Sequence, residues 1–341
     1  MSRRYLGVLP HNDPMYTFLA HEVLGQVLGI HSPFARFDVH RLDRLAVAFE
    51  YRERQSGVAL LGKFYGNKPL PFGKQVGSDH QAVQMQQEFA ALHYLRTLGL
   101  DHTPCRVVRP LAQSEALNCL LVEEFVAGED LLFFIRAAIE EGRSESLRTR
   151  LTELARLLAM LHDRTERWAP IDTAPVLAYL DKLIVQLTYW HILSLEQQQR
   201  LLALRAAWGK SLLLHGSRQV LIHGDATPAN FIFQEGQGVI AIDLERLRLG
   251  DRAADLGCIA AELKHLFLWY GHDEGASEPY IQHLYQSYVN YMAAQDESLT
   301  SLTARGRFYM GCIELRISRN AWLDWPYRRR LIDHAMGCLA I

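Results

Sequence analysis

The stretch VLIHGDATPANFIF, residues 220–233, decides the fold of this chain. It starts as a short apolar strand, runs into His-Gly-Asp, and places an asparagine five residues after the aspartate before the chain turns apolar again. A hairpin turn, QEGQG, then leads into the return strand VIAI, which ends at Asp243. Because a hairpin folds the chain back on itself, the sequence predicts that Asp225, Asn230 and Asp243 converge at one end of it.

Two carboxylates and a carboxamide gathered in this way indicate a site for a divalent cation. Mg²⁺ prefers oxygen ligands, takes few of them from the protein, and keeps positions for water and phosphate. Phosphoryl transfer needs such metal ions together with a carboxylate that receives the proton of the attacking alcohol. The spacing H-x-D-x-x-x-x-N is that of a kinase catalytic loop. The alternative is that the aspartate and the asparagine are ordinary turn residues.

Several stretches of the chain resemble the aminoglycoside phosphotransferase family, whose members are small-molecule kinases with a protein-kinase-like fold. Gly224 of HGD stands where protein kinases carry arginine, which favours the small-molecule kinases. The resemblance covers roughly residues 45–270 and is strongest over 221–257. The matching stretches are EFAALHYL (88–95), LLVEEFVAGEDL (120–131), LARLLAMLHD (154–163), IHGDATPANFIF (222–233) and VIAIDLERLRLGDRAADLG (239–257).

The resemblance implies a role for each residue of the central motif. Asp225 lies at the position of the catalytic aspartate, which orients the acceptor hydroxyl and accepts its proton. Asn230 and Asp243 lie at the two metal-ligand positions. His223 is expected to brace the loop by hydrogen bonding, and Asp255 to steady it from the GDRAADLG stretch. The implied cofactors are ATP and Mg²⁺.

The residues expected to bind the nucleotide lie before residue 126. Alternation along residues 58–65 puts Lys63 on a face with apolar side chains, from which an ammonium could reach the α- and β-phosphates. Glu88, the one glutamate of a helix predicted near 80–98, is its expected ion-pair partner. The backbone near Glu123 and Phe125 is expected to recognise adenine. The alternatives are a solvated lysine, a surface glutamate and a plain strand.

The loop that should cover the phosphates departs from the kinase pattern. Its sequence, HRLDRL at residues 40–45, contains no glycine, so it cannot wrap phosphates with free backbone amides. Arg41 and Arg44 either contact phosphate instead or are solvated. Glu245, after Asp243, either approaches metal or substrate or is a solvated charge.

The fold class expected from these patterns is α+β, a bilobal protein-kinase-like fold. The N-lobe, residues 1–125, has a small antiparallel sheet with helices, and the C-lobe, residues 126–341, is helical and carries the catalytic loop. The N-lobe elements expected are helices near 14–29 and 80–98 and strands near 33–40, 46–53, 58–65, 105–111 and 118–125. The C-lobe elements expected are a strand pair near 220–243 and helices near 130–141, 145–163, 173–190, 194–214, 251–269, 277–295, 300–320 and 326–339.

Composition limits the partners and the compartment. The formal net charge of -2 gives no field of one sign, so neither nucleic acid nor a membrane surface is an expected partner. The five cysteines are odd in number and form no CxxC pair, which disfavours a disulfide framework or a zinc site. The start of the chain lacks a signal-peptide apolar region, and no run of about 18 apolar residues occurs. A cytoplasmic location is therefore expected.

The acceptor is expected to be a small hydroxylated molecule, such as an amino sugar or an amino alcohol. Residues 265–341 carry eight acidic residues and seven arginines, a balance that does not argue for a polycation. The second interpretation is a catalytically silent, kinase-like nucleotide-binding module, favoured by the missing glycine loop and disfavoured by the filled catalytic positions. A protein kinase is disfavoured by HGD and by the absence of an A-P-E segment. The sequence makes no prediction of oligomeric state.

Overall fold

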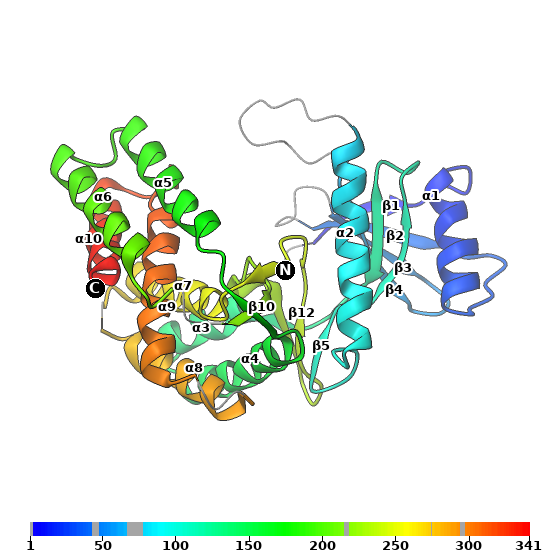
Figure 1. Ribbon diagram of the computed structural model, residues 1–341. Coiled ribbons are helices and arrows are strands. Elements are labelled where there is room, and N and C mark those ends of the chain that lie inside the picture. Colours follow the sequence, from blue (N-terminus) through cyan, green and yellow to red (C-terminus); the bar gives the residue numbers. More distant parts are fainter. Residues whose placement is uncertain (1–2, 43–47, 67–77, 215–217, 274, 294–296) are drawn as a thin grey trace. The chain divides into compact units, whose positions relative to one another are not determined.

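The computed structural model divides the chain into two compact units (Figure 1). It describes residues 3–42, 48–66, 78–214, 218–273, 275–293 and 297–341. The N-terminal unit comprises Met1–His102, Arg106–Ala127 and Ile242–Glu245. The C-terminal unit comprises Thr103–Cys105, Gly128–Ala241 and Arg246–Ile341.

The strands described in the N-terminal unit form a six-stranded antiparallel sheet in the order β1-β2-β3-β4-β7-β6. The consecutive strands β2, β3 and β4 are the three strands that the alternating sequence predicts. β1 is not predicted from the sequence, because nearly all of its side chains are exposed and the strand shows no buried face. The bounds are β1 (Arg3–Val8), β2 (Phe37–Leu42), β3 (Ala48–Glu53), β4 (Ala59–Phe64), β6 (Pro110–Ser114) and β7 (Leu120–Glu124).

Helices cover both faces of this sheet. The first begins as α1 (Pro14–Thr17), capped by the side chain of Asp13, and continues as the π-helix η1 (Phe18–Val27). Its apolar side chains pack with Leu120 and Val122 of β7, whereas Leu121 between them packs with α2 (Ser78–Thr97). Because neighbouring residues of a strand point to opposite faces, the two helices lie on opposite sides of the sheet (Figure 1).

The C-terminal unit is built mainly of helices, as predicted. Helix α7 is buried on nearly all sides and packs against α9, with the backbones so close that a Cβ on Gly257 would lie 2.6 Å from the carbonyl oxygen of Gly306. The helices are α3 (Leu131–Glu140), α4 (Ser144–Arg164), α5 (Ala174–Tyr189), α6 (Leu195–Lys210), α7 (Ala253–Gly271), α8 (Glu278–Tyr291), α9 (Leu299–Ile317) and α10 (Trp325–Leu339).

Short strands of the C-terminal unit carry the central motif. The predicted hairpin is present, since β11 (Phe231–Gln234) pairs antiparallel with β12 (Gly238–Ala241). β10 (Arg218–Ile222), which leads into His-Gly-Asp, lies between two strands that the sequence does not predict, β9 and β13. The remaining strands are β5 (Cys105–Val107), which begins in this unit, β8 (Glu129–Asp130), β9 (Arg167–Pro170) and β13 (Arg248–Gly250).

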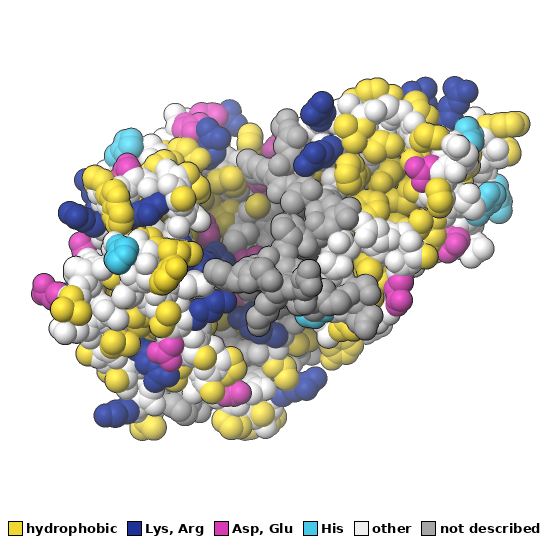
Figure 2. Space-filling view, turned by 90° about the horizontal axis from the view of Figure 1, so that it is seen from above, with side chains coloured by type: hydrophobic (Ala, Val, Ile, Leu, Met, Phe, Trp, Pro, Cys, Tyr) yellow, Lys and Arg dark blue, Asp and Glu magenta, His cyan; other side chains and the backbone are white. Residues whose placement is uncertain are grey.

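The distribution of charge on the surface and the state of the cysteines are consistent with the composition. Basic and acidic side chains are interspersed on the face shown in Figure 2. All five cysteines are buried, free thiols, and burial raises the pKa of Cys105 to about 11. Across the residues described, none of the helices combines the length and the apolar character that crossing a bilayer requires. The expectations about nucleic acid and membrane-surface partners remain predictions.

Candidate active site

The His-Gly-Asp turn follows β10 and can be made only with glycine at its centre. Gly224 has a φ of 77°, in the left-handed region that glycine adopts without strain. A Cβ at this position would lie 2.3 Å from the backbone oxygen of Arg246 and 2.4 Å from Nη1 of Arg248. The close approach of the segment after β12 therefore explains why an arginine cannot occupy the position here.

Asp255, in the first turn of α7, holds this loop by its backbone. Its buried carboxylate accepts hydrogen bonds from the backbone N–H groups of His223 (2.8 Å) and Gly224 (3.1 Å), and it contacts His162 Nε2 at 3.1 Å. Burial alone would raise the pKa of Asp255, but these hydrogen bonds and the nearby imidazoles lower it below its usual value. The expectation that Asp255 steadies the loop is confirmed.

His223 is completely buried beneath the loop. Its ring lies 5.2 Å from the ring of Phe231, at the start of β11. Its backbone N–H is the donor to Asp255. Whether its side chain braces the loop by hydrogen bonding stays a prediction.

Asp225 lies between two arginines. Nη1 of Arg316, on α9, is 3.2 Å from one carboxylate oxygen, and Nη1 of Arg246 is 3.5 Å from the other. Arg316 also donates to Glu262 at 3.0 Å. Burial would lower the pKa of Arg316, but the surrounding acidic groups raise it, so the guanidinium stays charged. The sequence patterns do not point to these two partners of Asp225, or to Glu262 behind Arg316, because only the tertiary fold brings them together.

Asn230 is tied to the backbone of the same loop. It ends the short 3₁₀ turn Pro228–Asn230, and its side-chain nitrogen donates to the backbone oxygen of Asp225 at 2.9 Å. Its own N–H donates to the oxygen of Thr227 at 3.0 Å. Because the amide nitrogen is used in this bond, the side-chain oxygen of Asn230 is the atom that could bind a cation.

The predicted ion pair of the N-terminal unit is present. Nζ of Lys63 lies 2.8 and 3.0 Å from the two carboxylate oxygens of Glu88, and 2.9 Å from Oδ1 of Asp243. The hydroxyl of Tyr65 contacts Glu88, and the backbone N–H of Leu244 donates to it at 3.0 Å. The contact of Tyr65 with Glu88 is not predicted from the sequence.

This group holds more negative than positive charge. Burial raises the pKa of Glu88 to about 8, and the neighbouring carboxylates of Glu123 and Asp243 act in the same direction. Burial alone would lower the pKa of Lys63, but the same three acids raise it well above its usual value. Three acidic side chains therefore surround one ammonium, an arrangement that an added cation would stabilise.

The donor set in this unit fits Mg²⁺. Glu88, Asp243 and Glu245 each offer a carboxylate oxygen, and these oxygens lie within 4.8 Å of one another. Glu88 is buried, whereas Glu245 is exposed. Hard, oxygen-only donors suit Mg²⁺ and do not suit metals that prefer thiolate or imidazole.

Other predicted site residues are placed as follows. Asp243 belongs to the N-terminal unit, whereas Asp225 and Asn230 belong to the C-terminal unit, so the convergence of the three stays a prediction. Glu123 is buried on β7, and the backbone N–H of Phe125 donates to the oxygen of Ala59 at 3.1 Å. Adenine recognition at this segment also stays a prediction.

The phosphate-covering loop is only partly described. Arg41 is exposed near the end of β2, and Arg44 lies outside the described residues. The expectation that either arginine contacts phosphate stays a prediction. Glu245, for which the sequence leaves two alternatives, lies near the Asp243 carboxylate.

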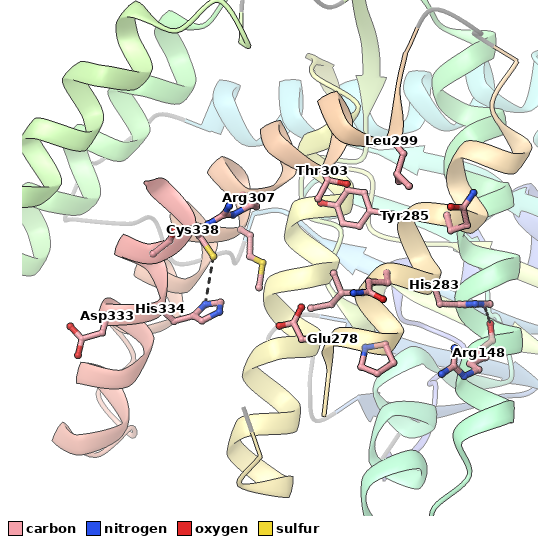
Figure 3. A pocket seen from close by; sticks show the side chains of 16 residues that line it. Arg148, Glu278, His283, Tyr285, Leu299, Thr303, Arg307, Asp333, His334 and Cys338 are labelled. Atoms are coloured by element: carbon pink, nitrogen blue, oxygen red, sulfur yellow. Dashed lines mark hydrogen bonds between the residues drawn. The ribbon is translucent and has the colours of Figure 1, made fainter. Parts of the chain in front are cut away.

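A cavity of about 640 Å³ opens beside the His-Gly-Asp loop, within the C-terminal unit. Gly224, Arg246 and Arg316 line it, together with the start of α5 and parts of β13, α7 and α9. A larger cavity, of about 1050 Å³, lies among α8, α9 and α10, where Cys338 is 3.6 Å from Nδ1 of His334 (Figure 3). Gly224, which precedes Asp225, and Asp255, which holds the loop, line the smaller cavity and not the larger one, so the smaller one is the candidate acceptor site.

The sequence profile of the phosphotransferase enzyme family matches residues 74–293, well over half of the chain. The chain belongs to the phosphotransferase enzyme family. The resemblance inferred from the sequence and the expected enzyme class are therefore confirmed for this phosphotransferase. Comparison with curated protein sequences gave no match.

Solved structures show that this phosphotransferase shares its fold with kinases of small molecules. A choline kinase from Cryptosporidium parvum Iowa II is similar with a TM-score of 0.61 and 14% identity, over 94% of this chain and 93% of that one. A Plasmodium vivax ethanolamine kinase has a TM-score of 0.57 and 12% identity, over 95% and 86%. Aminoglycoside 2'-phosphotransferase-IIIa has a TM-score of 0.54 and 12% identity, over 86% and 90%. The predicted fold class is confirmed.

Proposed function

We propose that the chain is an ATP-dependent phosphotransferase that moves the γ-phosphate to a hydroxyl of a small molecule. The observation that carries the proposal is the placement of Asp225. Its carboxylate lies on a loop that Asp255 holds through two backbone N–H groups. The preceding residue, Gly224, lines a cavity of about 640 Å³. This volume is within the range of small-molecule sites.

Asp225 would orient the acceptor and take its proton. As the hydroxyl oxygen bonds to the γ-phosphorus, its O–H bond breaks and the proton moves to the Asp225 carboxylate. The bond from the γ-phosphorus to the bridging oxygen breaks, and ADP leaves. The protein forms no covalent bond in this step, so catalysis rests on positioning and on charge stabilisation.

The charged groups of the two units would bind the nucleotide. We assign Lys63, held by Glu88, to the α- and β-phosphates, and Asn230 and Asp243 to the metal ion. Mg²⁺, when bound, supplies neutralisation of the charge on the phosphates. The oxygen-only donors and the surplus of carboxylates around Lys63 support this assignment.

Adenine recognition is assigned to the backbone after β7. The N–H groups of Glu124 and Phe125 already donate to the oxygens of Arg109 and Ala59, at 3.0 and 3.1 Å. Recognition is therefore assigned to other backbone groups of the segment from Glu123 to Val126. The side chains of this segment carry little of the specificity.

The test combines nucleotide binding with an acceptor screen. Wild-type protein should be stabilised against heat by Mg·ATP and Mg·ADP, and it should consume ATP in the presence of an accepted hydroxylated compound. Asp225→Asn should lose turnover and keep nucleotide binding, whereas the control Asp181→Asn, on α5 and paired with Arg205, should keep both. Binding without consumption for every acceptor would favour the catalytically silent nucleotide-binding module.

A further inference from the structure

The acceptor cavity is lined by more basic side chains than free acidic ones. Three arginines line it: Arg246, Arg248 and Arg316. The acidic residues of its lining are Asp172, Asp251 and Asp255. Whether this cavity suits a cation or an anion depends on which of these charges are already compensated.

Two of the three acids are committed to partners of their own. Asp251 is buried and bonded to the guanidinium of Arg305, with Nε at 2.9 Å from Oδ2. Asp255 holds the catalytic loop and His162, as described above. Asp172 is exposed, and its carboxylate accepts from the N–H of Ala174 at 3.1 Å. Little negative charge is left for a cationic ligand.

The arginines are compensated to different degrees. Arg316 is shared between Asp225 and Glu262. Arg246 is about half exposed, at 54%, and 3.5 Å from Asp225. Arg248 makes only long contacts from Nη1 to the backbone oxygens of Gly224 (3.5 Å) and Arg246 (3.4 Å), and within the described ranges of the chain no carboxylate pairs with it.

Arg248 also lies close to the loop where an acceptor would bind. Its guanidinium lies over Gly224, the residue before Asp225, as the 2.4 Å approach to a Cβ at that position shows. A guanidinium offers several N–H donors in one plane, which match the two oxygens of a carboxylate or a phosphate. Such a donor set beside the catalytic aspartate suits an anion attached to the molecule that is phosphorylated.

We infer that the acceptor is a hydroxylated molecule that also carries an oxyanion, and that Arg248 binds the oxyanion while the hydroxyl faces Asp225. This inference rests on the proposed function and names its substrate class. Apolar side chains of the cavity, among them Ile171, Val176 and Tyr179, would contact the carbon skeleton. A polycation would meet the guanidinium of Arg248 instead and would be repelled.

Matched acceptors that differ in charge test the inference. ATP consumption is measured with D-glucuronate against D-glucosamine, and with D-glycerate against ethanolamine. We expect kcat/KM for the anionic member of each pair to exceed that of the cationic member at least about tenfold, the value of one charge-assisted hydrogen bond. A preference for the cationic members would overturn the inference.

The variant Arg248→Gln separates acceptor binding from nucleotide binding. It should raise KM for the anionic acceptor about tenfold or more, with a smaller change in kcat and an unchanged Kd for Mg·ATP. The control Arg136→Gln, an exposed arginine of α3 paired with Glu140, should change neither. If Arg248→Gln instead weakens Mg·ATP and leaves acceptor KM unchanged, the guanidinium serves the nucleotide and the inference is wrong.

Calorimetry keeps this test independent of turnover. The same four compounds are titrated into Asp225→Asn protein in the presence of Mg·ADP. Tighter binding of the anions that depends on Arg248, with no ATP consumption by wild-type protein, would support the oxyanion site and defeat the proposed transfer. Equal or weaker binding of the anions would overturn the oxyanion site, whatever the turnover shows.

Discussion

The two charged groups of this phosphotransferase are built with opposite surpluses. In the N-terminal unit, the carboxylates of Glu88, Glu123 and Asp243 surround the single ammonium of Lys63. In the C-terminal unit, the carboxylates of Asp225 and Glu262 pair with Arg246 and Arg316, and the third arginine of the acceptor cavity, Arg248, has no carboxylate partner among the described residues. A surplus of carboxylates favours a bound cation, whereas a surplus of guanidinium groups favours a bound anion.

The two groups also differ in burial. The side chains of Lys63 and Glu88 are 8% and 0% exposed, whereas that of Asp225 is 20% exposed. Changes in the N-terminal group should therefore affect folding stability as well as ligand binding, because an unpaired charge there has little access to water. Changes at Asp225 should act mainly on the reaction.

The largest effect is expected for Asp225→Asn. The amide cannot accept the proton of the acceptor hydroxyl, so kcat should fall about 10³-fold. The affinity for Mg·ADP should stay within about twofold, because the nucleotide is assigned to other residues. Rates of ATP consumption and a calorimetric titration measure the two quantities. If the variant kept most of its turnover, Asp225 would not be the catalytic base, and the proposed difference in role between the two charged groups would be wrong.

Lys63→Met should have the next largest effect, and on two properties at once. Loss of the ammonium should weaken Mg·ATP binding by about 10- to 100-fold. At pH 8.5 it should also lower the free energy of unfolding by about 3 kcal/mol, since Glu88 is left buried beside other acids. At pH 6 the loss of folding free energy should be smaller, because Glu88 can take up a proton.

Denaturant unfolding and nucleotide titration of Lys63→Met check both parts. The double variant Lys63→Met/Glu88→Gln should regain part of the stability and none of the nucleotide affinity. Equal stability of the single and double variants at pH 8.5 would show that Glu88 does not depend on Lys63.

Asp255→Asn should have a smaller effect, which acts through the loop. The amide oxygen can still accept one backbone N–H, but the charge that His162 faces is lost. We expect kcat to fall about tenfold through misplacement of Asp225, with KM for Mg·ATP unchanged. Faster hydrogen exchange at the amides of His223 and Gly224 should accompany the loss. An unchanged exchange rate would show that other contacts hold the loop.

The smallest effect is expected in the dependence of stability on pH. The pKa of Glu88 is raised from 4.5 to about 8, so the folded protein binds more protons than the unfolded chain within this window. Stability from this group is full below about pH 4.5 and is lost as the pH rises through about 8. Glu88→Gln cannot titrate, so its Tm should change less than that of the wild type between pH 5 and about 8.5, by about a few degrees. Parallel Tm profiles would contradict the raised pKa.

Local patterns predicted the elements that have a buried and an exposed face. Strands β2 to β4, the hairpin of β11 and β12, and the helices of the C-terminal unit follow from periodicity and turn residues. The exposed edge strand β1 has no such periodicity. The assignment of Ile242–Glu245 to the N-terminal unit follows from packing and not from any feature of those four residues.

The residues of the candidate site also divide into those that local sequence patterns predict and those that only the fold brings together. His223, Asp225 and Asn230 lie in one motif with a fixed spacing, and the Lys63–Glu88 pair follows from one strand face and one helix. Arg316 is 91 residues from Asp225 along the chain, so no local signal joins them. Arg248 lies within the stretch that carries the family resemblance, but its exposure, and the lack of a carboxylate partner for it in the part of the chain that the structure describes, are properties of the fold alone.

The contact between Gly257 and Gly306 matters for anyone who redesigns this protein. α7 supplies Asp255 and α9 supplies Arg316, and the two helices meet backbone to backbone at these glycines. A methyl group on Gly257 would force α7 and α9 apart, whereas one on Gly306 would collide with Tyr285 of α8, and either change should alter the acceptor site. Libraries that seek new acceptors should therefore keep both glycines and diversify the first turns of α5, where Val176 and Tyr179 can be exchanged without disturbing that crossing.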